Sequence, residues 1–78
     1  MYNVFSGGGD TMKLTLKAAR VNKDLTQAEA AKLLGIGKDA LWNYEKGRSF
    51  PNVLVIKKME ELYGINYNDI IFLPKNNG

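Results

Sequence analysis

The chain has 78 residues, a formal net charge of +3, and neither cysteine nor histidine. This length suffices for one small domain, because a chain so short buries only about 60% of its unfolded surface. Without cysteine and histidine, disulfides, thiolate or imidazole metal sites and a Ser-His-Asp triad are excluded, so we expect no metal and no cofactor. The lack of cysteine fits a reducing cytoplasm, and no apolar run is long enough to span a bilayer.

The two ends of the chain differ in composition from its middle. Residues 1–11 contain the run Ser6-Gly7-Gly8-Gly9-Asp10, and the chain ends in Lys75-Asn76-Asn77-Gly78. Such segments favour flexible tails, so we place the folded domain at residues 12–74 and the tails at 1–11 and 75–78. One hypothesis is that the glycines before Met12 are a translated ribosome-binding site, with Met12 as the native start. A cloning remnant or a native arm are the alternatives.

Helical periodicity begins after Met12. Apolar spacing predicts a first helix from Leu14 to about Asn22 and a second that ends at Leu34; the residues assigned to their apolar sides are Leu14, Leu16, Ala18, Val21, Ala30, Ala31, Leu33 and Leu34. Thr26 and Glu29 are spaced as a capping box, in which each side chain accepts a backbone N–H from the other residue. Gly35 follows, at a point where glycine readily adopts the positive φ that ends a helix.

A third helix is predicted over residues 38–46 and ends at Gly47. Asp39 lies in its first turn, where a carboxylate complements the helix dipole. Leu41 and Tyr44 are three residues apart, so both are expected to face inward.

Two further helices complete the predicted domain. Asn52 is a suitable cap for a fourth helix, whose apolar stripe is Val53, Ile56, Met59, Leu62 and Tyr63. Asn66 is expected to cap a short fifth helix from Tyr67 to about Phe72. No alternating pattern predicts a strand, so the expected fold is all-α, a compact domain of five helices.

The connection between the second and third helices explains why two glycines interrupt a helical sequence. Ala31 is small enough for two helices to cross closely, and Gly35 allows a tight turn between them. This arrangement leaves one face of the third helix unpacked, with Lys38, Asp39, Trp42, Asn43 and Lys46. Such a face fits the major groove of DNA, which is about 12 Å wide and admits one helix.

The segment TQAEAAKLLGIGKDALWNYEKGRSFP resembles the helix-turn-helix of the Cro and lambda-repressor type, also called the XRE (xenobiotic-response-element) family. The resemblance covers roughly residues 14–72, with the helix-turn-helix itself at 27–46. It implies a lambda-repressor-like domain that binds operator DNA as a dimer. Gly37 and Asp39 depart from the hydroxyl and amide residues common at those positions, so the operator sequence is not predicted.

The resemblance also implies roles for individual residues. Gln27 and Arg48 match positions that contact the DNA backbone, whereas Lys38, Asp39 and Asn43 match positions that reach base edges; Trp42 and Lys46 complete the expected DNA-binding set. Arg20 and Glu45 match a partly buried ion pair.

Several of these roles have a competing structural interpretation. Lys38 and Asn43 could form only a solvated helix face, and Gln27 could be only a helix former. Asp39 could accept from cytosine N4 or only complement the helix dipole. Trp42 could press on a thymine methyl group or a sugar, cover apolar surface, or lie in a protein contact.

We therefore expect a sequence-specific transcriptional regulator that binds double-stranded DNA. The size suggests a Cro-like repressor of phage, prophage or mobile-element type, with no small-molecule ligand. An apolar excess near the C-terminal end suits a two-fold homodimer contact; it comprises Leu54, Val55, Ile70, Ile71, Phe72 and Leu73. The alternative is a protein-interaction module of the antitoxin or anti-repressor type. An enzyme is not expected, because the acidic residues are scattered rather than clustered.

Overall fold

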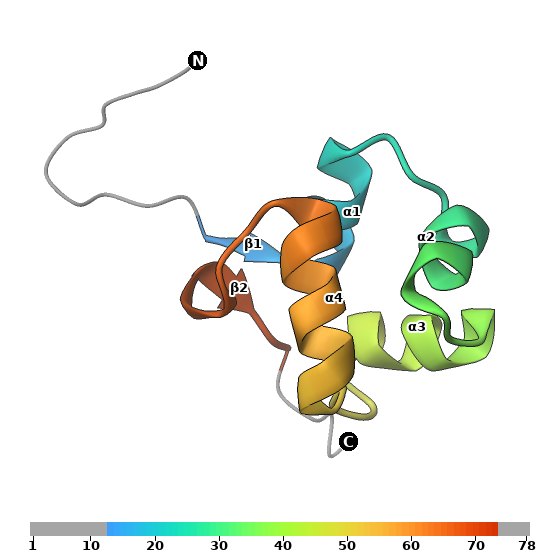
Figure 1. Cartoon of the computed structure of the whole chain (residues 1–78). Helices are drawn as coiled ribbons and strands as arrows, with labels where there is room; N and C mark the ends of the chain where they lie inside the picture. The colour runs from blue at the N-terminus through green and yellow to red at the C-terminus, as the bar shows by residue number, and fades with distance from the viewer. Residues whose placement is uncertain (1–12, 74–78) are drawn as a thin grey trace, which may run out of the picture.

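The computed structural model describes residues 13–73, and four α-helices carry most of them (Figure 1). In chain order the elements are β1 (Leu14–Thr15), α1 (Leu16–Asn22), α2 (Gln27–Leu34), α3 (Lys38–Lys46), α4 (Val53–Tyr63), the 3-10 helix η2 (Tyr67–Asp69) and β2 (Ile70–Ile71). Figure 1 shows α4 across the middle of the molecule, with α2 and α3 on one side and the two strands on the other. The expected tails, residues 1–11 and 75–78, lie outside the described residues.

The predicted helix-turn-helix forms with the predicted ends. Thr26 Oγ1 accepts the Glu29 backbone N–H at 3.1 Å, and Glu29 Oε1 accepts the Thr26 N–H at 2.9 Å, so the capping box is confirmed. Gly35 ends α2 with a φ of 72°, in the left-handed region that favours glycine. The helices α2 and α3 together cover the span 27–46 expected for this motif.

The first helix starts later than predicted, because Thr15 caps it. Thr15 has the extended backbone of an N-cap, and its Oγ1 accepts the Ala18 N–H at 3.1 Å. Leu14 and Thr15 are therefore extended rather than helical, and they pair in parallel with Ile70 and Ile71. The prediction that the chain has no strand was wrong, since two-residue strands are too short to show an alternating pattern.

The fifth predicted helix is only the three-residue turn η2 rather than a helix from Tyr67 to Phe72. Asn66 makes no side-chain cap; instead the Tyr67 N–H donates to Glu60 Oε2 at 2.7 Å. Isolated short helices are marginal, and Ile70 is buried in an extended conformation beside Leu14. The fold is thus mainly α-helical, with four α-helices and a small sheet in the described residues.

The core is formed by one side of each helix and by β2; its residues are Leu16, Ala19, Ala30, Ala31, Leu34, Leu41, Val55, Met59, Tyr63 and Ile70. Leu33 was predicted to be buried but is 61% exposed. At about 100° per residue, Ala30, Ala31 and Leu34 centre the buried arc of α2, and Leu33 lies about 100° from that centre. Val21 of α1 and Val53 of α4 were also assigned to apolar stripes. Both are exposed, because each likewise lies far around its helix from the buried arc.

The core holds α3 in one rotational setting. Leu41 is completely buried and Tyr44 is half-buried against the core, as predicted. Ala31 of α2, 3% exposed, is part of the same core. With Leu41 and Tyr44 turned inward, the opposite side of α3 must face solvent.

Candidate nucleic-acid interface

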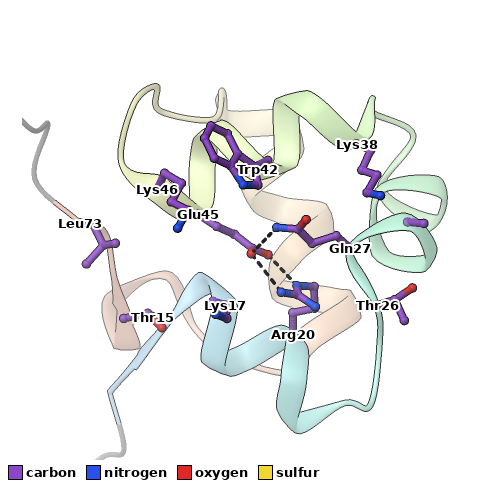
Figure 2. A pocket seen from close by; sticks show the side chains of 11 residues that line it. Thr15, Lys17, Arg20, Thr26, Gln27, Lys38, Trp42, Glu45, Lys46 and Leu73 are labelled. Carbon is purple, nitrogen blue, oxygen red and sulfur yellow. Dashed lines mark hydrogen bonds and ion pairs between the residues drawn. The ribbon is translucent and has the colours of Figure 1, made fainter.

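A concave surface lies between α1, the start of α2 and the outward side of α3 (Figure 2). We call it the basic cavity; its volume is about 660 Å³, and it is lined by Thr15, Lys17, Arg20, Thr26, Gln27, Ala28, Lys38, Trp42, Glu45, Lys46 and Leu73. Glu45 is the only carboxylate among these residues, and it is paired with Arg20. Three lysines, Lys17, Lys38 and Lys46, therefore give the cavity its positive charge.

A buried network joins α1, α2 and α3 at the floor of this cavity (Figure 2). Arg20 donates two hydrogen bonds to Glu45, from Nε to Oε2 at 2.7 Å and from Nη2 to Oε1 at 3.1 Å. Arg20 also donates from Nη1 to the Leu25 carbonyl at 2.8 Å. The two charged residues are each 7% exposed, so the predicted ion pair is confirmed and is more buried than expected.

Gln27 is part of the same network. Its side-chain amide donates from Nε2 to Glu45 Oε1 at 3.0 Å. An amide nitrogen carries two hydrogens, so this bond holds the side chain in place and leaves one N–H for another acceptor. Gln27 is the first residue of α2, where backbone N–H groups favour an anion.

Hydrogen bonding and burial in this region shift two pKa values. The hydrogen bond to Glu45 raises the pKa of Arg20 above its ordinary value, against the opposing effect of burial. Burial, and secondarily the Glu45 charge, raises the pKa of Tyr63 to about 12. The Tyr63 hydroxyl is buried and has no hydrogen-bond partner among the described residues. Both shifts favour the same state, a paired Arg20–Glu45 next to a neutral tyrosine.

The outward side of α3 carries the residues expected to bind DNA. At about 100° per residue they span about 140° of the helix surface in the order Lys38, Trp42, Lys46, Asp39 and Asn43. All are exposed except Asn43, which is half-buried. The predicted outward face is therefore present as one continuous strip.

The sole tryptophan, Trp42, lies in this strip with two cations over its ring. Lys46 Nζ is 5.6 Å from the ring centroid, and Arg48 Cζ is 5.0 Å from it. Both distances are within the range of a cation–π interaction. Trp42 is 38% exposed. This contact with two cations was not among the interpretations that the sequence suggested for Trp42.

The structure brings together most, but not all, of the predicted DNA-binding residues. Four of them line the basic cavity, namely Gln27, Lys38, Trp42 and Lys46, and Arg48 joins them through Trp42. Asp39 and Asn43 do not line the cavity and lie on the adjoining part of the α3 strip. The two parts together form a single surface across α2 and α3.

Lys17 was not among the residues expected to bind DNA, although it lines the basic cavity. Figure 2 shows it on α1, across from the α3 side chains. One signal could have found it: Lys17 lies three residues before Arg20, so both are on the same side of α1. Thr15, the N-cap of α1, and Leu73, two residues after the end of β2, also line the cavity.

Two kinds of feature are absent from residues 13–73. No group of three acidic residues in this part of the chain is placed to hold a metal ion. None of the described helices has the length and apolar character needed to cross a membrane.

Comparisons with known proteins assign the family. The chain matches the helix-turn-helix family model over residues 16–70. It is 32% identical over 56 residues to the cryptic phage CTXphi transcriptional repressor RstR of Vibrio cholerae, an overlap of 72% of this chain and 50% of that protein. It is 34% identical over 59 residues to an uncharacterized HTH-type transcriptional regulator of Methanocaldococcus jannaschii, covering 76% and 89% of the two chains.

A third relative, antitoxin PezA of Streptococcus pneumoniae, is 34% identical over 56 residues, covering 72% of this chain and 35% of the antitoxin. The chain thus spans half the length of the Vibrio repressor and about a third of the antitoxin. No solved structure matches it. The family match covers both helices of the motif and most of the described domain, and the chain therefore belongs to the XRE-type helix-turn-helix family of DNA-binding transcriptional regulators.

Proposed function

We propose that this chain is a sequence-specific, cytoplasmic transcriptional repressor that binds a palindromic operator through the major groove. One observation carries the proposal. The side of α3 that bears Lys38 and Asn43 faces solvent, whereas Leu41, on the other side of the same helix, is fully buried. A helix whose inward side is packed against the core can enter a groove with its outward side chains already in position. Binding there would exclude polymerase from an overlapping promoter.

The phosphate contacts are assigned to the edges of the surface. Gln27 has one free amide hydrogen at the start of α2, and Lys46 and Arg48 place cations at the end of α3. Contacts to phosphate set the register of a protein on DNA and supply much of its affinity. We therefore assign register and affinity to Gln27, Lys46 and Arg48.

The base contacts are assigned to Lys38, Asp39 and Asn43. Lysine donates to guanine O6 or N7, asparagine pairs with adenine, and a carboxylate accepts from cytosine N4. Lys38 and Asp39 occupy the first turn of α3, the end that enters the groove in this motif. Trp42 lies between the phosphate-binding and base-reading groups.

A homodimer is supported by exposed apolar surface around the start of α4. A groove of about 550 Å³ is lined by Phe50, Pro51, Asn52, Val53, Ile56, Lys57, Glu60 and Tyr67. Leu54, the residue after Val53 on α4, is 71% exposed, and Ile71 of β2 is 42% exposed. Two copies joined here by a two-fold axis would bury this surface and present two α3 helices, which need a spacing of about 34–36 Å to reach successive grooves.

The phage or mobile-element origin rests on similarity alone. Among the relatives, the Vibrio cholerae protein is a cryptic phage transcriptional repressor, and the present chain aligns with half of it. We extend that role to this chain as part of the proposal.

The test is selection of bound duplexes from a random pool, followed by affinity measurements on Lys38→Ala and Asn43→Ala. We expect an inverted repeat to be enriched and each variant to lose about 1–3 kcal/mol of discrimination at one position of each half-site. Leu33→Ala, an exposed apolar change on α2 outside the basic cavity, is the matched control and should keep the wild-type preference. If Lys38→Ala and Asn43→Ala also keep it, the assignment of base contacts is wrong.

A second candidate function is a protein-interaction module, favoured by the similarity to the antitoxin PezA. The two functions differ in their response to salt. DNA binding through several phosphates falls steeply as salt rises. A chain that binds no duplex even at low salt would favour the second candidate.

A further inference from the structure

Trp42, the only tryptophan of the chain, has two cationic neighbours brought to it in different ways. Lys46 is four residues later on α3, so it lies one turn along the same side of the helix. Arg48 follows Gly47, whose φ of 77° ends α3 and turns the chain back. The Arg48 backbone N–H then donates to the Asn43 carbonyl at 2.9 Å, which holds the arginine next to the helix it has just left.

Lys46 and Arg48 are both positively charged and so repel each other, and long cationic side chains lose rotamer freedom when a phosphate immobilises them. The negative face of an indole ring attracts a cation, more strongly for tryptophan than for other aromatic residues. At 5.6 and 5.0 Å from the centroid, the Lys46 and Arg48 charges both receive this attraction. The ring therefore reduces the repulsion and limits the orientations of both side chains before any ligand binds.

The same contacts argue against direct base reading by Trp42. The cations are placed over the face of the ring, where a stacked base or a thymine methyl group would need free surface. Lys38 lies one turn earlier on the same side of α3 and also lines the basic cavity. Among the described contacts it has no cation–π contact with an aromatic ring. We propose that Trp42 is a positioning residue that orders Lys46 and Arg48 for phosphate contact, rather than a residue that reads a base; this inference rests on the proposed function.

The experiment compares wild type, Trp42→Leu and Trp42→Phe on the selected operator and on a scrambled duplex of the same length, by fluorescence anisotropy with labelled DNA. We expect Trp42→Leu to weaken binding to both duplexes by about fivefold and to leave their affinity ratio within about twofold of wild type. Trp42→Phe keeps a weaker ring and should show an intermediate loss. Circular dichroism melts verify that each variant folds.

A double-mutant comparison separates positioning from a merely structural role. In the Lys46→Ala/Arg48→Ala background, Trp42→Leu should change affinity by less than about twofold, because no cation remains to be ordered. An undiminished effect in that background would overturn the inference. So would a loss confined to the selected operator, which would make Trp42 a base reader.

A third measurement needs no DNA and keeps this inference distinct from the proposed function. In the free protein, the indole ring current should shift the NMR signals of the Arg48 side-chain methylene protons, and Trp42→Leu should remove the shift. Absence of the shift in wild type overturns the ring–cation contact. Its presence in a protein that binds no duplex would refute the proposed function while the contact itself stands.

Discussion

Replacing Glu45 by alanine tests the buried network that joins the three helices of the candidate interface. Glu45 accepts three N–H groups: two from Arg20, at 2.7 and 3.1 Å, and one from Gln27, at 3.0 Å. In Glu45→Ala, the Arg20 guanidinium stays buried with only the Leu25 carbonyl, at 2.8 Å, as an acceptor. Removing one partner of a buried ion pair costs roughly 3–5 kcal/mol, because the other charge is left uncompensated.

That cost is a large part of the total stability. For 78 residues, the free energy of unfolding is expected to be roughly 4–12 kcal/mol. Urea unfolding followed by far-UV circular dichroism measures the loss directly. With a denaturant slope of about 1 kcal/mol per molar for so small a chain, the midpoint should fall by about 3–5 M, or the variant should be unfolded without urea.

The double variant Arg20→Met/Glu45→Leu is the matched control. It replaces both charges by apolar side chains of similar volume, so no charge is left buried, and it should recover most of the loss. A midpoint shift below about 0.5 M for Glu45→Ala would refute the assigned cost. A double variant no more stable than the single variant would show that the loss does not come from an uncompensated charge.

Three further changes test other parts of the structure. Gly35→Ala should lower the free energy of unfolding by about 1–2 kcal/mol, since its φ of 72° is costly for a residue with a Cβ, whereas Gly37→Ser, at a φ of −73° in open space, should not destabilise in the same thermal melts. Tyr63, with its pKa raised from 10.0 to about 12, favours the folded state fully below pH 10 and loses that contribution by pH 12. Alkaline urea titrations should therefore show wild type losing roughly 2 kcal/mol more than Tyr63→Phe over this range, and equal losses would contradict the shift. Leu54→Glu should sediment as a folded monomer. Leu33→Glu, which also puts a charge on an exposed apolar site, should keep the mass of the wild-type dimer. A Leu54→Glu variant that remains a dimer would place the interface elsewhere.

Burial was less predictable from the sequence than helix position. Apolar residues at helix ends were assigned to the core by spacing alone, and Leu33, at 61% exposed, does not belong there. Arg20 shows the opposite case: it is a charged residue on the core side of α1, and its burial depends on the Glu45 carboxylate of α3. Only the resemblance to a family suggested that pair, because no local pattern connects residues so far apart.

Part of the candidate surface was likewise beyond sequence reasoning. The strip on α3 followed from helical phase, once Leu41 and Tyr44 were placed inward. The hydrogen bond from Gln27 to Glu45 joins residues 18 apart and depends on how α2 packs against α3. The contact of Arg48 with Trp42 depends on the left-handed turn at Gly47, and its distance could not be read from composition or spacing.

By itself, the sequence determined the helix-turn-helix. The capping box of Thr26 and Glu29 and the left-handed end at Gly35 are local, since each depends on bonds between residues three to five apart. Such bonds need only the right residues at the helix end and no distant partner. The tertiary structure alone decided that Leu14 pairs with Ile70 in a strand and that the last segment forms a 3-10 turn. The physical reason is that short segments have little intrinsic preference, so their conformation follows from the burial and the hydrogen bonds that distant residues provide.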